Sequence, residues 1–307
     1  MSELPFVIFK MGPTATGKTD LAIYLHERIN SEIISVDSAM VYRGLDIGTA
    51  KPSKELLKKF PHHLVNVCDP AEIYSAARFQ KDAYLAINEI HNRGKIPILV
   101  GGTGLYFRAL EYGLDKLPEA DYGIRTTIEA EAEVKGWVYM HDKLSKIDPD
   151  SASRIDRNDT QRIQRALEVY EITGNTLTEL TATPEKRPFE FPIKKFILFP
   201  NDRIELHKRV KQRFIKMLEI GLVKEVESFY NRNDLTPDLP SMRLVGYRQI
   251  WKYLDNQITY MEMQERSIIA TRQLAKRQMT WCRTEKNAEW HNPYKSGVFQ
   301  EILNNLK

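Results

Sequence analysis

The sequence predicts an α/β protein: a parallel sheet flanked by helices and interrupted by an all-helical insertion. Strand and helix signals alternate through the first third of the 307-residue chain. The segment Pro118–Pro188 is then nearly all helical in pattern, and a strand signal returns at Lys194–Phe199. Because strands that alternate with helices form parallel sheets covered on both faces, the helical block is expected to interrupt the sheet domain. We therefore predict a core formed by 1–117 and 191–307, and an insertion domain at 118–190.

Apolar runs and amphipathic segments alternate in the first third of the chain. Strands are expected at Pro5–Met11, Glu32–Val36 and Ile96–Val100, with His62–Val67 as a further candidate. Helices are expected at Lys18–Ile29, Ser75–Asn92 and Leu105–Glu111. The second of these helices has one apolar face at helical spacing, formed by Ala76, Phe79, Ala83, Ile87 and Ile90.

The insertion and the second half of the chain are predicted to be mainly helical. In "DTQRIQRALEVYEITG" Asp159 is placed to cap the first turn and Gly174 to end the helix. The buried stripe of this helix is expected to be Ile163, Ala166, Leu167 and Tyr170. Later helices are expected at Asp202–Leu218, Leu222–Tyr230 and Tyr260–Arg283, with an edge strand at "AEWH" near Trp290.

The composition favours a globular protein of a reducing compartment. A net charge of +4 and a pI near 8.8 permit an anionic partner without requiring one. Cys68 and Cys282 have neither metal-ligand nor redox spacing. No run approaches the roughly 20 apolar residues that span a bilayer, and the N-terminal apolar run is too short for a signal peptide. We expect a cytoplasmic monomer with no membrane partner.

The stretch "GPTATGKTD" matches the phosphate-loop pattern GxxxxGK[ST] at every fixed position and lies between the first strand and the first helix. Gly12 and Gly17 let the backbone turn tightly, so that successive N–H groups face one anion beside the positive end of the helix dipole. Lys18 supplies a point charge, and the Thr19 hydroxyl is a candidate magnesium ligand. The loop alone leaves open whether the phosphate belongs to a nucleoside triphosphate or to another substrate.

Polar residues also follow two other predicted strands. Asp37 stands where Glu32–Val36 ends, and because sites in open parallel sheets lie at the carboxyl ends of strands, it is expected to border the phosphate loop. It could hold magnesium through water, act as a general base, or serve only as a turn or cap residue. In "GGTGLY" the glycines allow a ligand to approach the backbone, and Thr103 offers a hydroxyl to the same cleft.

Basic residues occur beside aromatic residues in the last third of the chain. They are Arg243 and Arg248 around Gly246 and Tyr247, and Arg272, Lys276, Arg277 and Arg283 beside Trp281. The insertion adds Arg154, Arg157, Arg162 and Arg165. Arg162 and Arg165 lie off the apolar stripe and are expected to be free to meet an anion. Such patterns suit phosphate contact with base stacking, although a solvated helix face is the alternative. Two basic surfaces could clamp one nucleic acid.

Taken together and in this order, the motifs resemble those of the tRNA dimethylallyltransferases, also called tRNA isopentenyltransferases. The resemblance spans nearly the whole chain and is carried by "GPTATGKT", "SVDSAMVY", "LDIGTAKP", "HHLVNVCDP", "GGTGLYF", "RNDTQRIQRALEVYEITG", "LPSMRLVGYRQIW" and "TRQLAKRQMTW". It implies a P-loop, nucleotide-kinase-like sheet. It also implies transfer of the dimethylallyl group of dimethylallyl diphosphate to N6 of adenosine 37, giving N6-(dimethylallyl)adenosine in tRNAs that read codons beginning with U.

The resemblance also implies a role for each matching residue. Asp37 would be the general base, Thr103 would line a channel between the substrates, and Arg213 in "KQRF" would meet the leaving diphosphate. The diphosphate-binding residues would be Gly12, Pro13, Thr14, Ala15, Thr16, Gly17, Lys18 and Thr19, with Mg²⁺ at Thr19. The residues implied to contact the tRNA anticodon stem-loop are Asp37, Ser38, Ala39, Met40, Thr103, Arg125, Gln161, Arg162, Ile163, Gln164, Arg165, Arg243, Leu244, Val245, Gly246, Tyr247, Arg248, Lys276, Arg277, Gln278, Met279, Thr280, Trp281, Cys282 and Arg283.

Two other classes of protein share parts of this pattern. A small-molecule kinase would have the same loop, sheet and magnesium, but it would have no use for the basic carboxyl-terminal half. An RNA-binding module without catalysis would need neither the intact phosphate loop nor Asp37. Transfer of a prenyl group to RNA without ATP distinguishes the predicted enzyme from both.

Overall fold

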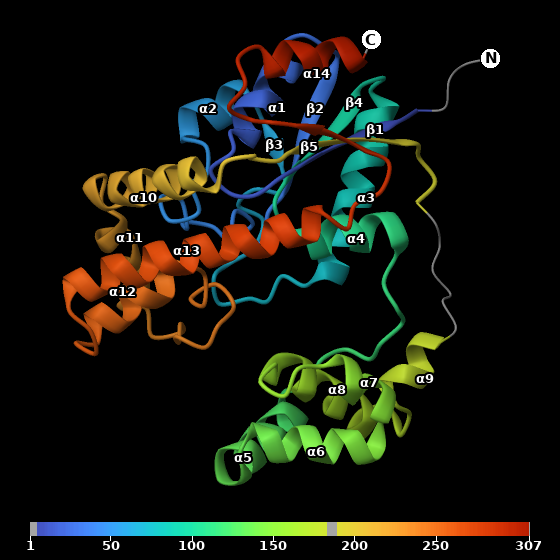
Figure 1. Cartoon of the computed structure of the whole chain (residues 1–307), viewed down its shortest axis with the longest axis vertical. Helices are drawn as coiled ribbons and strands as arrows, with labels where there is room; N and C mark the ends of the chain where they lie inside the picture. The colour runs from blue at the N-terminus through green and yellow to red at the C-terminus, as the bar shows by residue number, and fades with distance from the viewer. Residues whose placement is uncertain (1–4, 183–188, 307) are drawn as a thin grey trace. The chain divides into compact units, whose positions relative to one another are not determined.

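The computed structural model describes residues 5–182 and 189–306, which form two compact units (Figure 1). The larger unit comprises Met1–Glu111 and Phe189–Lys307, and the smaller unit is Tyr112–Pro188. The breaks expected from the sequence lie a few residues later, at 117/118 and 190/191. In the described ranges no helix is both long and apolar enough to cross a bilayer.

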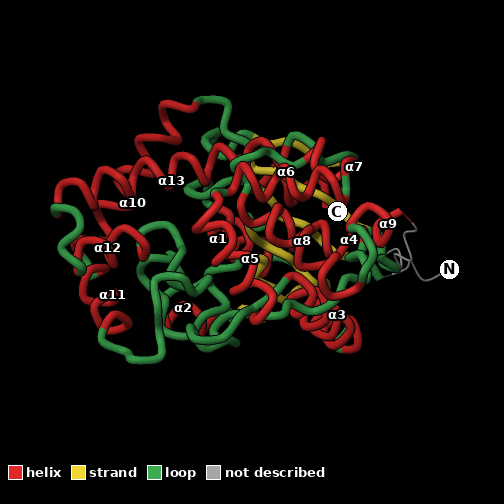
Figure 2. Tube along the Cα trace, turned by 90° about the horizontal axis from the view of Figure 1, so that it is seen from below, coloured by secondary structure: helices red, strands yellow, loops and turns green. Residues whose placement is uncertain are grey.

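One six-stranded sheet forms the centre of the larger unit, where its strands run side by side (Figure 2). Its strands are β1 (Val7–Met11), β2 (Ser31–Val36), β3 (His62–His63), β4 (Ile96–Gly101), β5 (Ile193–Leu198) and β6 (Ala288–His291). All neighbouring strands are parallel, in the order β3-β2-β4-β1-β5-β6. The predicted α/β class is therefore confirmed, and so is the edge strand at "AEWH".

Nine helices of the larger unit are described, and they surround this sheet. They are α1 (Lys18–His26), α2 (Lys54–Lys59), α3 (Ala76–Asn92), α4 (Gly104–Tyr112), α10 (Arg203–Glu219), α11 (Leu222–Tyr230), α12 (Tyr247–Leu254), α13 (Tyr260–Cys282) and α14 (Val298–Leu306). Helices α10 and α13 pack along each other, gold and orange-red in Figure 1. Short α2, α12 and α14 were not expected from the sequence; α2 buries none of its residues, so it has no apolar pattern to detect.

Alternation along the strands sends side chains into two separate cores. Phe9 of β1 packs on the face covered by α3, α4 and α11–α13, whereas Ile8 packs on the face covered by α1 and α14. Lys10 is fully buried, and its Nζ has no hydrogen-bond partner among the described residues. Burial, followed by the nearby Lys18 charge, lowers the pKa of Lys10 well below the ordinary lysine value.

The smaller unit contains five described helices around a core of its own. They are α5 (Tyr122–Lys135), α6 (Trp137–Ile147), α7 (Pro149–Arg154), α8 (Thr160–Thr173) and α9 (Leu177–Ala182). Helix α8 has the predicted ends. The Asp159 carboxylate accepts the backbone N–H of Arg162 at 3.2 Å, and Gly174 adopts the left-handed φ of 70° that favours glycine.

Two local predictions were wrong. Tyr170 is only half-buried, and Glu168 of α8 is buried in its place because two arginines pair with its carboxylate. The candidate strand His62–Val67 is reduced to two residues. It ends because Leu64 and Asn66 adopt left-handed φ values of 62° and 59°, which cannot continue an extended strand.

Candidate active site

The phosphate loop joins β1 to α1 as a tight turn. At Gly12 a Cβ would lie 2.5 Å from the carbonyl oxygen of Leu198, so only glycine fits there. Gly17 has a left-handed φ of 72° and precedes α1 without any side-chain cap. The first N–H groups of α1 therefore remain available, and the N-terminus of a helix with available N–H groups binds anions.

Two cations face this loop from different elements. Lys18 Nζ donates to the Pro13 carbonyl at 2.6 Å, and burial lowers the Lys18 pKa to about 8, with Asp37 opposing and Arg213 adding to the shift. Arg213 of α10 makes no hydrogen bond or ion pair with any described residue. Burial lowers its pKa, and Asp37 raises it. A bound diphosphate would supply the counter-charge that both cations lack.

Asp37 follows β2 and is held by its own turn. Its Oδ1 accepts the N–H groups of Ala39 at 2.8 Å and Met40 at 3.3 Å, whereas its Oδ2 has no partner within the described chain. Thr103 Oγ1 accepts the backbone N–H of Ser38 at 3.0 Å and donates to the Ser38 hydroxyl. The turn role and the functional role that the sequence left open are thus compatible, since one oxygen orients the carboxylate and the other is exposed to a ligand.

Loop, carboxylate and cations line one cavity of about 1030 Å³ in the larger unit. The expected site residues in this lining are Thr14, Ala15, Thr16, Gly17, Lys18, Thr19, Asp37, Ala39, Met40, Arg213, Leu244, Val245, Tyr247 and Gln278. Thr103 supports the lining through Ser38 and is not part of it. Much of the remaining wall is apolar and includes Phe214, Met217 and Leu274. The cavity therefore combines an anion site with a surface for a hydrocarbon group.

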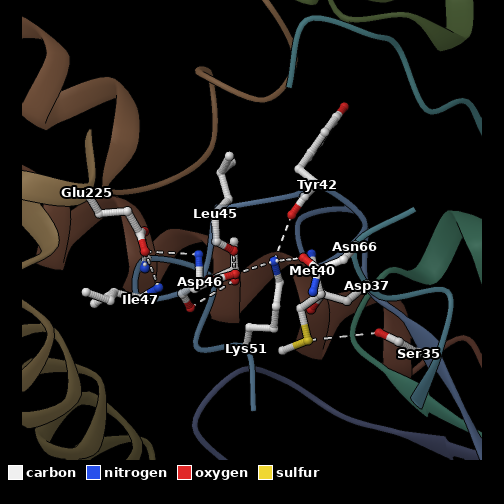
Figure 3. Close-up of polar contacts among 12 residues, drawn as sticks. Ser35, Asp37, Met40, Tyr42, Leu45, Asp46, Ile47, Lys51, Asn66 and Glu225 are labelled. Carbon is white, nitrogen blue, oxygen red and sulfur yellow. Dashed lines mark hydrogen bonds and ion pairs between the residues drawn. The ribbon is translucent and has the colours of Figure 1, made fainter. Parts of the chain in front are cut away.

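The segment 45–53 forms a further wall that the sequence did not assign to the site (Figure 3). Lys51 Nζ donates to the Tyr42 carbonyl, Asp46 Oδ1 and Asn66 Oδ1, each at 2.7 Å. The Lys51 side chain is only 1% exposed, and all three ammonium protons have acceptors. Lys51 therefore joins the chain at Tyr42 and Asp46, which follows Asp37, to the turn at Asn66.

Glu225 of α11 holds the same segment from the opposite side. Its two carboxylate oxygens accept the N–H groups of Asp46, Ile47 and Gly48 at 3.0, 2.6 and 3.1 Å. The Tyr247 hydroxyl completes this set, and Figure 3 shows the carboxylate pointing at the segment. No local sequence motif indicates the contacts between Glu225 and the three backbone N–H groups, because they join residues more than 170 positions apart. Only the fold brings these residues together.

Helix α13 presents its basic residues on a second face. Lys276, Arg277, Thr280 and Trp281 line a hollow of about 470 Å³ together with Arg108 of α4. The Trp281 ring stacks on Phe107 at 5.8 Å, which keeps it rigid. Met279 and Cys282, also expected to meet tRNA, are buried in the core.

The arginines of the smaller unit are less free than expected. Glu168 accepts Arg125 Nε at 2.8 Å and Arg165 Nη1 at 2.6 Å, and Arg165 also donates to the Pro118 carbonyl. The expectation that Arg165 is free to meet an anion is therefore wrong. Arg162 is 71% exposed and has only a loose pair with Asp159. Ile163 is buried, whereas Gln161 is exposed.

The fold and this cavity define a P-loop α/β protein in which an anion-binding type of loop and a carboxylate face the same cavity. A family model described as IPP transferase matches residues 40–285. The tRNA dimethylallyltransferases of Alkalilimnicola ehrlichii and Thioalkalivibrio sulfidiphilus are each 54% identical to the chain. These matches cover 94% and 93% of this chain, and 91% and 89% of the two relatives. The chain therefore belongs to the IPP transferase family.

Solved structures show the same fold. The full-length tRNA isopentenylpyrophosphate transferase of Bacillus halodurans is 37% identical with a TM-score of 0.72, covering 98% of this chain and 95% of its own. A eukaryotic dimethylallyltransferase acting on tRNA is 28% identical with a TM-score of 0.80, covering 97% of this chain and 78% of its own. The resemblance that the motifs indicated is confirmed.

Proposed function

We propose that this protein transfers the dimethylallyl group of dimethylallyl diphosphate to N6 of adenosine 37 in tRNAs that read codons beginning with U. One observation carries the proposal: Asp37, Lys18 and Arg213 face one cavity whose lining also includes the apolar side chains of Phe214, Met217 and Leu274. A kinase site needs polar contacts for a sugar or another hydroxyl-bearing substrate. A prenyl donor instead needs an anion site joined to an apolar surface.

The loop serves the leaving group in this reaction. The carbon–oxygen bond of the donor breaks, and its electron pair goes to the diphosphate. Departure is easy only where preorganised donors meet the growing charge. The N-terminal N–H groups of α1, the Lys18 ammonium and the Arg213 guanidinium are placed for that task, because all three elements line the cavity.

Asp37 serves the nucleophile. The lone pair on adenine N6 is delocalised into the ring, so the nitrogen becomes reactive as its proton is removed. The open Oδ2 of Asp37 accepts that proton as the N6–carbon bond forms. To reach the cavity the base must leave its stack, which costs about a few kcal/mol.

Mg²⁺ fits the residues present. The Thr19 hydroxyl lines the cavity and has no hydrogen-bond partner in the described chain, and no cluster of three or more His, Cys, Asp or Glu side chains there could hold a metal alone. Magnesium commonly binds through one or two protein groups and the phosphates of its substrate. When bound it would neutralise diphosphate charge.

The anticodon stem-loop is proposed to bind the basic residues of α13, the segment Arg243–Arg248 and the exposed residues of the smaller unit. Lys276, Arg277 and Trp281 support this assignment, because two cations border a rigid aromatic ring in one hollow. We further propose a monomer acting in the cytoplasm, where the free Cys68 and Cys282 would stay reduced.

A transfer assay tests the function. The protein is incubated with magnesium, dimethylallyl diphosphate labelled in the prenyl group, and an unmodified tRNA carrying A-A-A at positions 36 to 38. We expect label in the RNA without ATP. A tRNA with guanosine at position 37 is the matched control and should stay unlabelled. Label that depends on ATP, or no label at all, would rule the proposal out.

A further inference from the structure

Gln278 of α13 joins the phosphate loop to the end of β4. Its Oε1 accepts the backbone N–H of Thr14 at 2.8 Å, and its Nε2 donates to the Gly102 carbonyl at 3.1 Å. Both ends of the amide are used, so the side chain is fixed in one orientation. These partners lie 264 and 176 positions away in the sequence, so the contact connects three segments of the cavity wall.

The contact with Gln278 requires glycine at position 102. A Cβ there would lie 2.4 Å from Gln278 Nε2, closer than any side chain tolerates. Apart from Gln278, the loop is braced through its own Pro13 carbonyl, which accepts Thr16 Oγ1 at 2.8 Å and Lys18 Nζ at 2.6 Å. Among the described residues, Gln278 is therefore the side chain from outside the loop that hydrogen-bonds to it, and it ties the loop to the end of β4.

We propose that Gln278 is a positioning residue for the diphosphate loop, and not a tRNA contact as its place among the basic residues of α13 suggested. It faces the donor cavity, whereas Lys276 and Arg277 line the hollow on the other face of the same helix. By holding the Thr14 N–H and the Gly102 carbonyl, it fixes the loop that receives the diphosphate against the end of β4. The inference rests on the proposed function, since it names the diphosphate as the ligand that the loop receives.

The test compares Gln278→Met, which keeps the length and loses both hydrogen bonds, with Gln264→Met on the same helix outside the cavity lining. Inorganic diphosphate with magnesium is titrated into each protein by calorimetry. We expect Gln278→Met to bind it roughly tenfold more weakly, as two lost hydrogen bonds imply, and Gln264→Met to bind it normally. In transfer assays the KM for dimethylallyl diphosphate should rise by a similar factor, and the KM for tRNA should change less than twofold.

Gly102→Ala displaces the same amide from the other side, so it should reproduce this donor-specific loss even where Gln278→Met folds poorly. A higher KM for tRNA with a normal KM for the donor would overturn the proposal, as would normal diphosphate binding in the Gln278→Met and Gly102→Ala proteins. If the wild-type protein transfers no label, the proposed function fails, whereas the diphosphate titration still decides the role of Gln278.

Discussion

Two polar clusters border the same cavity and differ in how their charges are satisfied. In the cluster formed by Lys51, Glu225 and the groups that they bind, all three Lys51 ammonium protons and both Glu225 carboxylate oxygens have partners from the chain. Around the phosphate loop, in contrast, Arg213 and the Asp37 Oδ2 have none within the described residues. Both residues are half-buried and line the cavity, so their unpaired groups are accessible to a ligand. The first cluster therefore holds the walls in place, and the second offers its groups to the substrates.

Among the residues around the phosphate loop, Asp37 should have the largest effect on the rate of transfer when it is replaced. Asp37→Asn keeps an oxygen for the Ala39 and Met40 N–H groups but cannot accept the N6 proton. We expect the rate of transfer to fall by roughly 10²–10⁴-fold, the range of a general base. Single-turnover kinetics measure this fall, and filter binding should show tRNA affinity within about threefold. A large loss of tRNA binding with normal single-turnover rates would instead make Asp37 a binding residue.

The Lys18 ammonium should give the donor affinity a pH limit. Because burial lowers its pKa to about 8, Lys18 is protonated below pH 8 and loses its charge above it. The diphosphate prefers the charged form, so the KM for the donor should be flat below pH 8 and rise by up to about tenfold per pH unit above it. Lys18→Arg, whose guanidinium stays charged, should have a flat profile whatever its absolute KM. A parallel rise in both proteins would remove Lys18 as the cause.

Disrupting the contacts of Lys51 and Glu225 should lower the free energy of unfolding more than it lowers the rate of transfer. Glu225→Gln places an NH₂ group against backbone N–H donors and leaves them unpaired, so unfolding free energy should fall by about 2 kcal/mol. Urea denaturation measures the loss, with exposed Glu227→Gln as the control. Equal stability of the two variants would show that the segment 45–53 does not depend on this carboxylate.

Lys10 belongs to neither cluster, and its removal should be mildly stabilising. Its lowered pKa means that the folded protein favours the neutral amine, whereas the unfolded chain carries the charge up to about pH 10.5. The resulting cost is present at pH 7 and fades as the pH rises towards 10.5. Lys10→Met should therefore raise the unfolding free energy at pH 7 by about 1 kcal/mol or more, and by less at pH 10. Exposed Lys58→Met is the control, and a destabilised Lys10→Met would reveal a partner for the amine.

The features that could be predicted from the sequence are those that local residues determine. The phosphate loop, the position of Asp37 at a strand end and the caps of α8 depend on neighbours in the chain, and they were found where expected. Arg165 looked free because it lies off the apolar stripe of α8, and the sequence gives no sign that its partner Glu168 is buried. Lys51 has no local signal of its role. Its acceptors are set by the fold, so their arrangement could not be derived from spacing or periodicity.

At three glycines, side chains from the last quarter of the sequence leave no room for a Cβ atom. A Cβ on Gly48 would lie 2.4 Å from the Tyr247 ring, and one on Gly104 would lie 2.3 Å from the Trp281 ring, as Gly102 is crowded by Gln278. During synthesis the phosphate loop therefore emerges long before the residues that close around it. Because such long-range contacts form late in folding, the donor site becomes complete only after α12 and α13 have left the ribosome. Until then the phosphate loop and the end of β4 lack the side chains of α12 and α13 that enclose the cavity.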